Sequence, residues 1–215
     1  MTLIFDLDGT LLDTLEDLHR SVNHALSSNA FPTLSPEDVR KALGWGAHEL
    51  IRRCLPDGVS EERLEATFAT FHEHYKLHSS DHTAPYNGII NMLKECRRRG
   101  YATAIVSNKP DYAVQTLYQR FFSEVIDIAV GAQSGMPIKP APDMVLYAQE
   151  RLGGNSAAIY IGDSEIDIAT AEAAQMPCIA VSWGFRGRHS LEENKAQHII
   201  DSPSEFFKMV EKIDL

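Results

Sequence analysis

The order of strands and helices along the chain restricts its fold more than any other feature of the sequence. From residue 85 onward, short apolar runs such as Tyr101–Val106 and Ala157–Ile161 alternate with segments that have helical spacing. This alternation is typical of a parallel sheet that is covered by helices on both faces. We therefore predict an α/β fold with a Rossmann-like parallel sheet as its core.

The pattern predicts a definite set of elements. A first strand should end at Phe5. The later strands are expected at residues 101–106, 125–130, 157–161, 178–181 and 198–201. The helices between and after these strands are expected at residues 89–99, 110–121, 141–152, 165–174 and 203–213.

Residues 15–82 differ from the rest because they show helical spacing and no convincing strand. Helices are expected at residues 15–28, 48–55 and 60–78, and another should begin at Pro36 with Ser35 as its N-cap. A helical block that interrupts an α/β pattern indicates an inserted domain. We therefore predict a core made of residues 1–14 and 83–215, and a helical cap made of residues 15–82.

Composition limits the partners that the chain can bind. Of its 215 residues 44% are hydrophobic, which is ordinary for a protein with a packed core. The formal net charge of −10 argues against nucleic acid and anionic membranes as main partners. A small phosphorylated metabolite is compatible with that charge, because a local site can be positive within an acidic protein. We expect a monomer or a homodimer.

The cysteines and the N-terminus bear on the cellular compartment. Cys54, Cys96 and Cys178 are far apart and lack metal-ligand spacing, which favours free thiols in a reducing environment. The N-terminus shows no basic segment followed by a long apolar run, the pattern of a signal peptide. We therefore expect a cytoplasmic protein.

The segment Asp6-Leu7-Asp8-Gly9-Thr10 follows the first apolar strand and carries two carboxylates with one residue between them. If the backbone is extended there, both side chains leave on the same face. Two carboxylates at such short range repel each other unless a cation lies between them. The segment therefore predicts metal binding or proton transfer.

Polar clusters fall at the carboxyl ends of the predicted strands, or in the loops beyond them, where open parallel sheets bind their ligands. They are Asp6 with Asp8, Ser107-Asn108-Lys109, Lys139-Pro140 and Gly162–Asp167. A divalent cation shared by these carboxylates would offset their repulsion, and a hard oxygen shell with few protein ligands favours Mg²⁺. Together the clusters hold a carboxylate nucleophile, a second carboxylate, a hydroxyl, an amide, a lysine and a metal site. This combination is typical of phosphoryl transfer.

In these four motifs the chain resembles the haloacid dehalogenase superfamily, which carries them in the same order. Within it, the segments that most resemble phosphoglycolate phosphatases with a helical cap are VSNK (106–109), IKPAPDM (138–144), GDSEIDIATAEAA (162–174) and SWGFR (182–186). The resemblance implies that Asp6 forms an aspartyl phosphate and that Asp8 transfers the protons. It also implies that Thr10, Ser107 and Asn108 bind phosphate, and that Lys139 neutralises both the phosphate and Asp6.

The same resemblance implies a set of metal ligands. Mg²⁺ would be held by the Asp6 carboxylate, the backbone carbonyl of Asp8 and the Asp163 carboxylate. Asp167 is counted with them and would orient the ligands through water or hydrogen bonds.

The resemblance further implies that the loop at Gly44-Trp45-Gly46 in the cap faces the active site. Gly46 and Arg52 are therefore predicted to help bind the substrate, and Arg52 or Arg53 to bind a substrate carboxylate. His74, His78 and His82 are spaced by four and are predicted to share a helix face, with His72 nearby. A zinc site and a solvated helix both fit this cluster, and the solvated helix is the commoner case.

The predicted function is a Mg²⁺-dependent phosphatase that hydrolyses a small phosphomonoester, with phosphoglycolate as the first choice of substrate. The alternatives are a pyrophosphatase, a phosphosugar mutase, a 2-haloacid dehalogenase, or a protein that binds phosphate without catalysis. Asp8 and Asp163 count against the dehalogenase, which needs neither. The binding protein is disfavoured because neither the nucleophile nor the lysine is missing.

Overall fold

The structure is a computed structural model that describes residues 1–154 and 156–213. The chain divides into two compact units. The first comprises Met1–Leu12 and the chain from Pro85 onward, and the second comprises Asp13–Ala84. The short strands β2 (Leu12–Asp13) and β3 (Ala84–Pro85) lie where the chain passes from one unit to the other.

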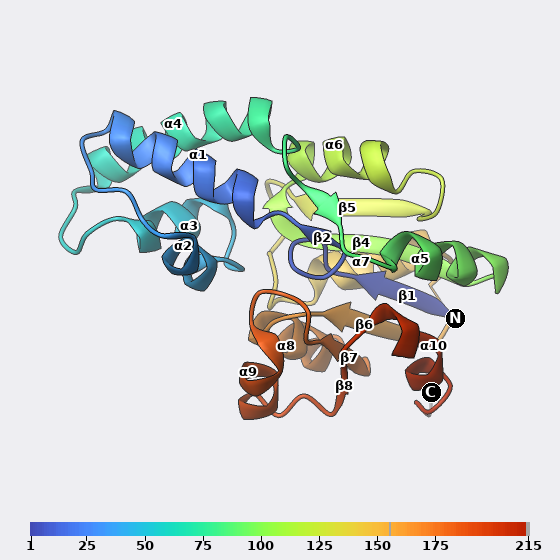
Figure 1. Cartoon of the computed structure of the whole chain (residues 1–215). Helices are drawn as coiled ribbons and strands as arrows, with labels where there is room; N and C mark the ends of the chain where they lie inside the picture. The colour runs from blue at the N-terminus through green and yellow to red at the C-terminus, as the bar shows by residue number, and fades with distance from the viewer. Residues whose placement is uncertain (155, 214–215) are drawn as a thin grey trace. The chain divides into compact units, whose positions relative to one another are not determined.

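The first unit is built on a six-stranded sheet (Figure 1). Its strands are β1 (Thr2–Phe5), β4 (Ala102–Pro110), β5 (Ile128–Ala132), β6 (Ala158–Gly162), β7 (Cys178–Val181) and β8 (His198–Ile200). The strands lie in the order β5-β4-β1-β6-β7-β8, and all adjacent pairs are parallel. This confirms the predicted α/β fold with a parallel sheet.

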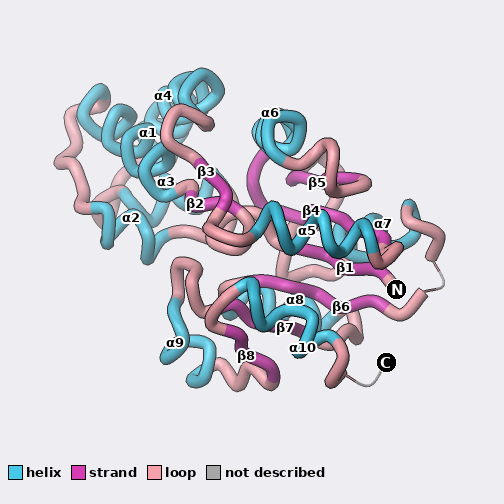
Figure 2. The backbone as a smooth tube through the Cα atoms, turned by 45° about the vertical axis from the view of Figure 1, so that its right-hand side comes forward, coloured by secondary structure: helices cyan, strands magenta, loops and turns pink. Residues whose placement is uncertain are grey.

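Helices cover both faces of this sheet (Figures 1 and 2). They are α5 (Ile89–Arg98), α6 (Asp111–Phe121), α7 (Asp143–Arg151), α8 (Glu165–Ala173), α9 (Gly187–Glu193), the 3-10 turn at Pro203–Glu205 and α10 (Phe206–Val210). Apolar residues of α5, α6 and α10 pack on one face, and residues of α7 and α8 pack on the other. Since both faces are covered, the central strands carry apolar runs such as Leu3–Phe5 and Ala104–Val106, whose side chains alternate between the two cores.

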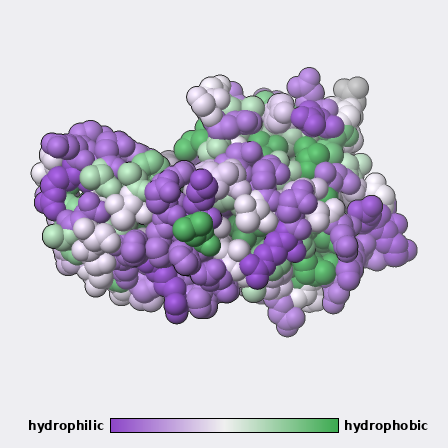
Figure 3. Space-filling model, turned by 90° about the horizontal axis from the view of Figure 1, so that it is seen from above, coloured by the Kyte–Doolittle hydropathy of each residue, from purple (hydrophilic) through white to green (hydrophobic). Residues whose placement is uncertain are grey.

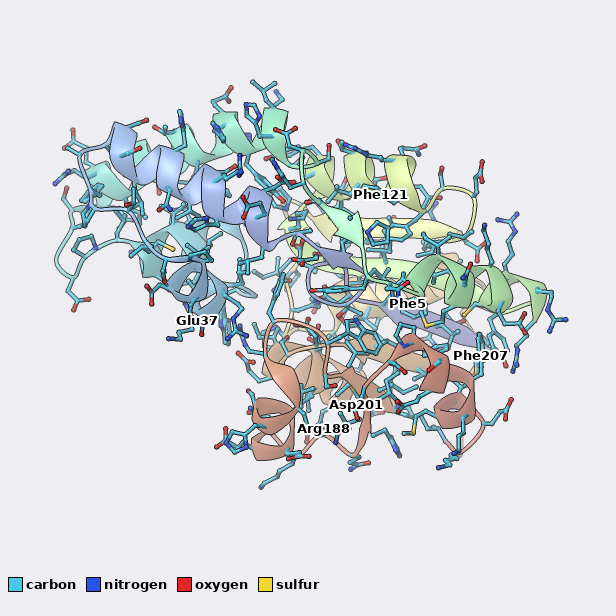
Figure 4. The ribbon with its side chains drawn as sticks, in the orientation of Figure 1. Phe5, Glu37, Phe121, Arg188, Asp201 and Phe207 are labelled. Atoms are coloured by element: carbon cyan, nitrogen blue, oxygen red, sulfur yellow. The ribbon has the colours of Figure 1, made fainter. Side chains whose placement is uncertain are left out.

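The side chains of β1 show how one strand serves both layers. Leu3 and Phe5 point into the core that contains α10, where the ring centroid of Phe5 lies 5.9 Å from that of Phe206. Ile4 points into the opposite core. Figure 4 labels Phe5 on this strand. Full burial of such a side chain contributes about 1.5–3 kcal/mol to stability.

The register of the central strands brings their ends to the same level. Phe5 pairs with Ile105 of β4 on one side and with Ile161 of β6 on the other. The residues that follow these three positions therefore emerge together at the carboxyl edge of the sheet. β1 lies where the strand order reverses direction, which is the usual ligand-binding crevice of an open parallel sheet.

Several predicted boundaries differ from the structure. The strand predicted at residues 125–130 is β5 at Ile128–Ala132, because Val125 and Ile126 are buried in the turn after α6, where their backbone amides donate to the Phe122 carbonyl. The helix predicted at residues 110–121 is α6 at Asp111–Phe121, because β4 continues to Pro110.

The ends of other predicted helices also shift. The helix predicted at 141–152 is the shorter α7 at Asp143–Arg151, and the final helix divides into the 3-10 turn and α10. The helix α9 was not predicted.

The second unit is helical, as the sequence predicts. Its helices are α1 (Leu15–Ser28), α2 (Pro36–Ala42), α3 (Ala47–Cys54) and α4 (Glu61–His78). The Ser35 side chain accepts a hydrogen bond from the backbone amide of Asp38, which confirms Ser35 as the N-cap and Pro36 as the first helical residue of α2. Buried Asp17 accepts hydrogen bonds from the backbone amides of His82 and Thr83, and so ties α1 to the end of this unit.

The surface carries few large apolar side chains. Leu77, Ile138 and Leu146 are the large hydrophobic residues that are exposed among the described positions. The face drawn in Figure 3 is mostly hydrophilic, with separate hydrophobic patches. No helix in the described ranges combines the length and the apolar character that a membrane crossing demands. Cys54, Cys96 and Cys178 are free thiols, as predicted.

Candidate active site

The turn after β1 carries Asp6 and Asp8. The Asp6 amide donates to the Ile161 carbonyl at 2.8 Å, so Asp6 still follows the line of the sheet. The chain then turns at Gly9, where φ is +85° and an added Cβ would collide with the Asp163 carboxylate. Glycine is needed here for both reasons.

Lys139 joins the acidic groups of the site. Its buried ammonium donates to Asp6 Oδ1 at 2.7 Å, Asp167 Oδ1 at 2.8 Å and the Tyr160 hydroxyl at 2.9 Å. A lysine has three N–H donors, and all three are used. Burial by itself lowers the pKa of Lys139, but the charges of Asp167 and Asp6 outweigh it and raise the pKa above its ordinary value.

Asn108 holds Lys139 in position through its backbone. The Asn108 side-chain amide donates to the Lys139 carbonyl at 2.9 Å, and its Oδ1 accepts from the Lys139 amide at 2.8 Å. Asn108 was predicted to bind phosphate, and the structure gives its side chain this positioning contact. The neighbouring Ser107 is buried, and its hydroxyl oxygen accepts from the Lys109 amide at 3.2 Å.

Asp167 lies in the first turn of α8 and is bonded through both carboxylate oxygens. Oδ1 accepts from Lys139 and from the Tyr160 hydroxyl at 3.0 Å. Oδ2 accepts from the amides of Asp163 and Ser164 and from the Ser164 hydroxyl, which completes a capping box at the start of α8. These bonds suit Asp167 to orienting its neighbours.

Asp163 precedes α8 and is buried. Its Oδ2 accepts from the Phe185 amide at 2.7 Å, and its Oδ1 accepts from the Thr10 hydroxyl at 3.3 Å. Thr10, predicted to bind phosphate, is therefore bonded to Asp163. Burial and the negative charges of Asp167 and Asp6 raise the pKa of Asp163 well above its ordinary value.

The loop after β7 forms part of this site, although its residues were used only for the family resemblance and were not predicted as site residues. Trp183 Nε1 donates to the Thr10 carbonyl at 3.0 Å. At Gly184 an added Cβ would collide with Asp163 and with the Gly9 carbonyl. Arg186 pairs with Glu165 at 2.9 Å. The sequence signal that could have identified this loop is the motif SWGFR (182–186), in which an indole N–H donor and a glycine directly follow the end of a strand.

Tyr160 is another residue that the sequence analysis missed. It is fully buried in β6, and its hydroxyl connects Lys139 with Asp167. Burial and the charge of Asp167 raise the pKa of Tyr160, so that it remains a neutral donor. A tyrosine in a buried strand usually has a partner for its hydroxyl, which is the signal that could have identified it.

The carboxylates of Asp6, Asp163 and Asp167 form a group that can hold a metal ion. One ligand atom from each lies within 4.8 Å of the others. Burial raises the pKa of Asp6 from 3.8 to about 7, and although Lys139 lowers it, Asp167 and Asp8 add to the increase. A cation here would favour the ionised carboxylates, and an all-oxygen donor set suits a hard ion.

Lys109 is a second buried lysine in this region. Its ammonium lies 3.0 Å from Asp8 Oδ1, and only 3% of its side chain is exposed, compared with 21% for Asp8. The two aspartates after β1 thus each have a lysine of their own, Lys139 for Asp6 and Lys109 for Asp8.

Gly46 and Arg52 belong to the helical unit. Gly46 precedes α3 with φ at +87°, and Arg52 lies within that helix. The Arg52 guanidinium pairs with Glu61 at 3.0 Å and with Glu49 at 3.6 Å. Arg53 pairs with Glu49 and lies 5.0 Å from the ring centroid of Trp45. The predicted substrate roles of Gly46 and Arg52 stay predictions.

The cap histidines do not all share one helix. α4 ends at His78, and His82 lies beyond it, bonded to Asp17. The ring of His74 stacks on that of His78 at 4.3 Å and on that of His24 at 4.1 Å. Some groups of described residues bring possible metal-ligand atoms within 4.8 Å of one another, and His48 with Glu61 and Glu65 is one such group. The rings of His24, His74 and His78 belong to none of these groups.

Residues 3–181 match the family model of the haloacid dehalogenase-like hydrolases. The chain belongs to this family. The hydrolase is 34% identical over 211 residues to "Phosphoglycolate phosphatase 1" of Pseudomonas aeruginosa, covering 93% of this chain and 76% of that protein. It is 32% identical over 204 residues to "Phosphoglycolate phosphatase, plasmid" of Cupriavidus necator, covering 93% and 88%.

Solved structures share the fold of this hydrolase. A protein from Lactobacillus delbrueckii subsp. bulgaricus superimposes with a TM-score of 0.90 at 33% identity, over 95% of each chain. A "predicted phosphoglycolate phosphatase" from Haemophilus somnus 129PT does so with a TM-score of 0.89 at 27% identity, over 97% of each chain. Both similarities extend over nearly the whole chain.

Proposed function

We propose that this hydrolase is a Mg²⁺-dependent phosphatase that cleaves a small phosphomonoester through an aspartyl-phosphate intermediate. The observation that carries the proposal is the pair Asp6 and Asp8, which follow the central strand and are each paired with a buried lysine. The phosphoglycolate phosphatases among the relatives support the phosphatase class.

Asp6, the Asp8 backbone carbonyl and Asp163 would hold the metal ion. Asp167, whose two oxygens already accept five hydrogen bonds from Lys139, Tyr160, Asp163 and Ser164, would hold those ligands in place. The carboxylates of Asp6, Asp163 and Asp167 have one lysine, Lys139, among them, and one divalent cation balances the remaining negative charge. When bound, Mg²⁺ neutralises phosphate charge that grows as the ester bond breaks.

In the first step, a carboxylate oxygen of Asp6 attacks the phosphorus atom. The bond between phosphorus and the ester oxygen breaks, and Asp8, which carries a proton at this stage of the cycle, gives that proton to the departing alcohol. Lys139 holds the attacking carboxylate at 2.7 Å and fixes its orientation.

In the second step, Asp8 takes a proton from a water molecule, whose oxygen attacks the same phosphorus atom. The bond between phosphorus and Asp6 breaks, inorganic phosphate leaves, and Asp6 returns as a carboxylate. Asp8 regains the proton that it gave away, so the cycle is balanced.

We propose phosphoglycolate as the first substrate to test, since the named relatives act on it according to their names. The experiment measures phosphate release from phosphoglycolate, sugar phosphates, nucleotides and pyrophosphate, with Mg²⁺ or with EDTA. Asp6→Asn keeps the shape of the nucleophile but removes its reactivity, and should lower kcat on the order of 10⁴-fold or more.

The proposal fails if the wild type releases no phosphate from any ester, or if Asp6→Asn retains the wild-type rate. If EDTA leaves the rate unchanged, the reaction does not depend on Mg²⁺ and that part of the proposal is wrong. The best substrate in the panel would decide between the phosphomonoesterase and the pyrophosphatase.

A further inference from the structure

Lys109 has no part in the proposed reaction, although burying its charge is costly. A buried ammonium is stable only where negative charge compensates it. The Asp8 carboxylate supplies such a charge at 3.0 Å. β4 carries Lys109 along with Ser107 and Asn108, so its position is set by the same strand that builds the rest of the site.

The two buried lysines contact different carboxylates of the proposed reaction. Lys139 contacts the nucleophile Asp6, and its three donors are taken by protein groups. Lys109 contacts Asp8, the residue that must meet the leaving group. Lys139 therefore belongs to the phosphoryl side, and Lys109 to the leaving-group side.

The distance requirement of proton transfer places Lys109 near the departing alcohol. A general acid must approach the ester oxygen to about 2.6–3.2 Å. Since the Lys109 ammonium lies 3.0 Å from Asp8 Oδ1, it is close to the first atoms of the leaving group. In a 2-phosphocarboxylate, a single carbon separates the ester oxygen from the carboxylate, which therefore comes within reach of this ammonium.

The alternative candidate for binding a carboxylate is Arg52, but its side chain is exposed to solvent. The Arg52 side chain is 47% exposed, and its guanidinium pairs with Glu61 and Glu49. Solvent and two carboxylates weaken its attraction for another anion. Lys109 is buried instead, so its attraction for an incoming carboxylate is much less screened.

We propose that Lys109 binds the carboxylate of the leaving group and makes the enzyme selective for phosphomonoesters whose alcohol carries an acid on the adjacent carbon. This rests on the proposed function, because it assumes that Asp8 meets the ester oxygen. Lys109 is then a specificity-determining residue of the reaction.

The test compares two esters of similar size, 2-phosphoglycolate and monoethyl phosphate. In Lys109→Met, kcat/KM for phosphoglycolate should fall about 10- to 150-fold, the range for a lost charge-assisted hydrogen bond. The value for monoethyl phosphate should change far less. Lys94→Met, at an exposed position of α5, is the matched control and should leave both values unchanged. An equal fall for both esters, or no fall, overturns the proposal.

A binding measurement on the wild type keeps the proposal testable if Lys109→Met does not fold. Calorimetry in Mg²⁺ compares 3-phosphonopropionate, which carries the carboxylate, with propylphosphonate, which lacks it. We expect tighter binding of 3-phosphonopropionate, and equal affinities overturn the proposal. This binding measurement does not depend on catalysis. If the proposed function itself is wrong, the wild type will release no phosphate from any ester, which is a separate result.

Discussion

Lys139 sets the charge balance around the proposed nucleophile. Its ammonium contacts two buried carboxylates and a buried hydroxyl, and so it joins the end of β1 to β6 and α8. Such a cation stabilises the fold mainly because its removal leaves charges without compensation.

We expect Lys139→Ala to damage both activity and stability. Loss of the cation should lower kcat by about 10²–10³-fold or more. The carboxylates left in the interior should lower the free energy of unfolding by about 3–5 kcal/mol at neutral pH. Phosphate-release assays and urea denaturation measure the two effects. Lys94→Ala is the control, and a stability of Lys139→Ala equal to that of wild type would contradict this account.

The sequence identifies charged residues of the site better than it identifies their partners. Asp6, Lys139 and Asp163 were predicted because acidic and basic residues after strands are conspicuous. Tyr160 was missed because its environment depends on which strands are adjacent, and the contact of Asn108 with Lys139 was not predicted because the two residues lie 31 positions apart. Contacts of this kind arise from the tertiary fold.

At the scale of elements, the loop after β7 positions the carboxylate that is proposed to bind the metal. The Phe185 amide holds Asp163, and the Trp183 indole holds the carbonyl of Thr10. Gly184 lets the loop approach closely enough for both bonds. The loop after β7 therefore holds both the turn after β1 and the start of α8 in position.

We expect Gly184→Ala to weaken the binding of Mg²⁺. The new methyl group would enter space occupied by the Asp163 side chain and the Gly9 carbonyl. Changes that disturb the orientation of metal ligands cost about 10–100-fold in affinity. Calorimetric titration with Mg²⁺ gives the value directly. In the control Gly187→Ala, the added methyl meets open space, although φ is +70°, so stability should fall slightly while the affinity stays.

Equal Mg²⁺ affinities in wild type and Gly184→Ala would show that this loop does not position the metal ligands. The sequence predicted β7 itself but not the loop that follows it. Strand signals depend on local apolar runs, while the role of a loop depends on what it approaches. The same reason accounts for Val125 and Ile126, whose apolar side chains are buried in a turn instead of in β5.

For the whole molecule, the buried carboxylates couple stability to pH and to metal. The pKa of Asp6 rises from 3.8 to about 7 on folding, mainly because of burial. Between these values the folded chain binds more protons than the unfolded chain, so this group makes stability fall as the pH rises from about 4 to about 7. A metal ion that binds the ionised form opposes this loss.

We therefore expect Mg²⁺ to raise the melting temperature more at pH 8 than at pH 5.5. Because a proton competes with the metal at Asp6, the affinity should decrease by up to about tenfold per pH unit below 7. Thermal denaturation with Mg²⁺ or EDTA at the two pH values tests this. In Asp6→Asn, the competing proton is absent, and the pH dependence should be smaller. If Mg²⁺ raises the melting temperature of the wild type equally at both pH values, the proposed competition between the proton and the metal is wrong.

The paired hydrogen bonds between Asn108 and the backbone of Lys139 have a consequence for protein engineering. They anchor Lys139 to β4 without using the connection from β5, which runs from Gln133 to Ile138. We therefore expect that this connection can be lengthened while the ammonium keeps its place. A peptide tag or a reporter inserted near Gly135, where a side chain meets open space, would leave phosphate release intact. The expected insertion point therefore lies close in sequence to Lys139, one of the most constrained residues of the enzyme.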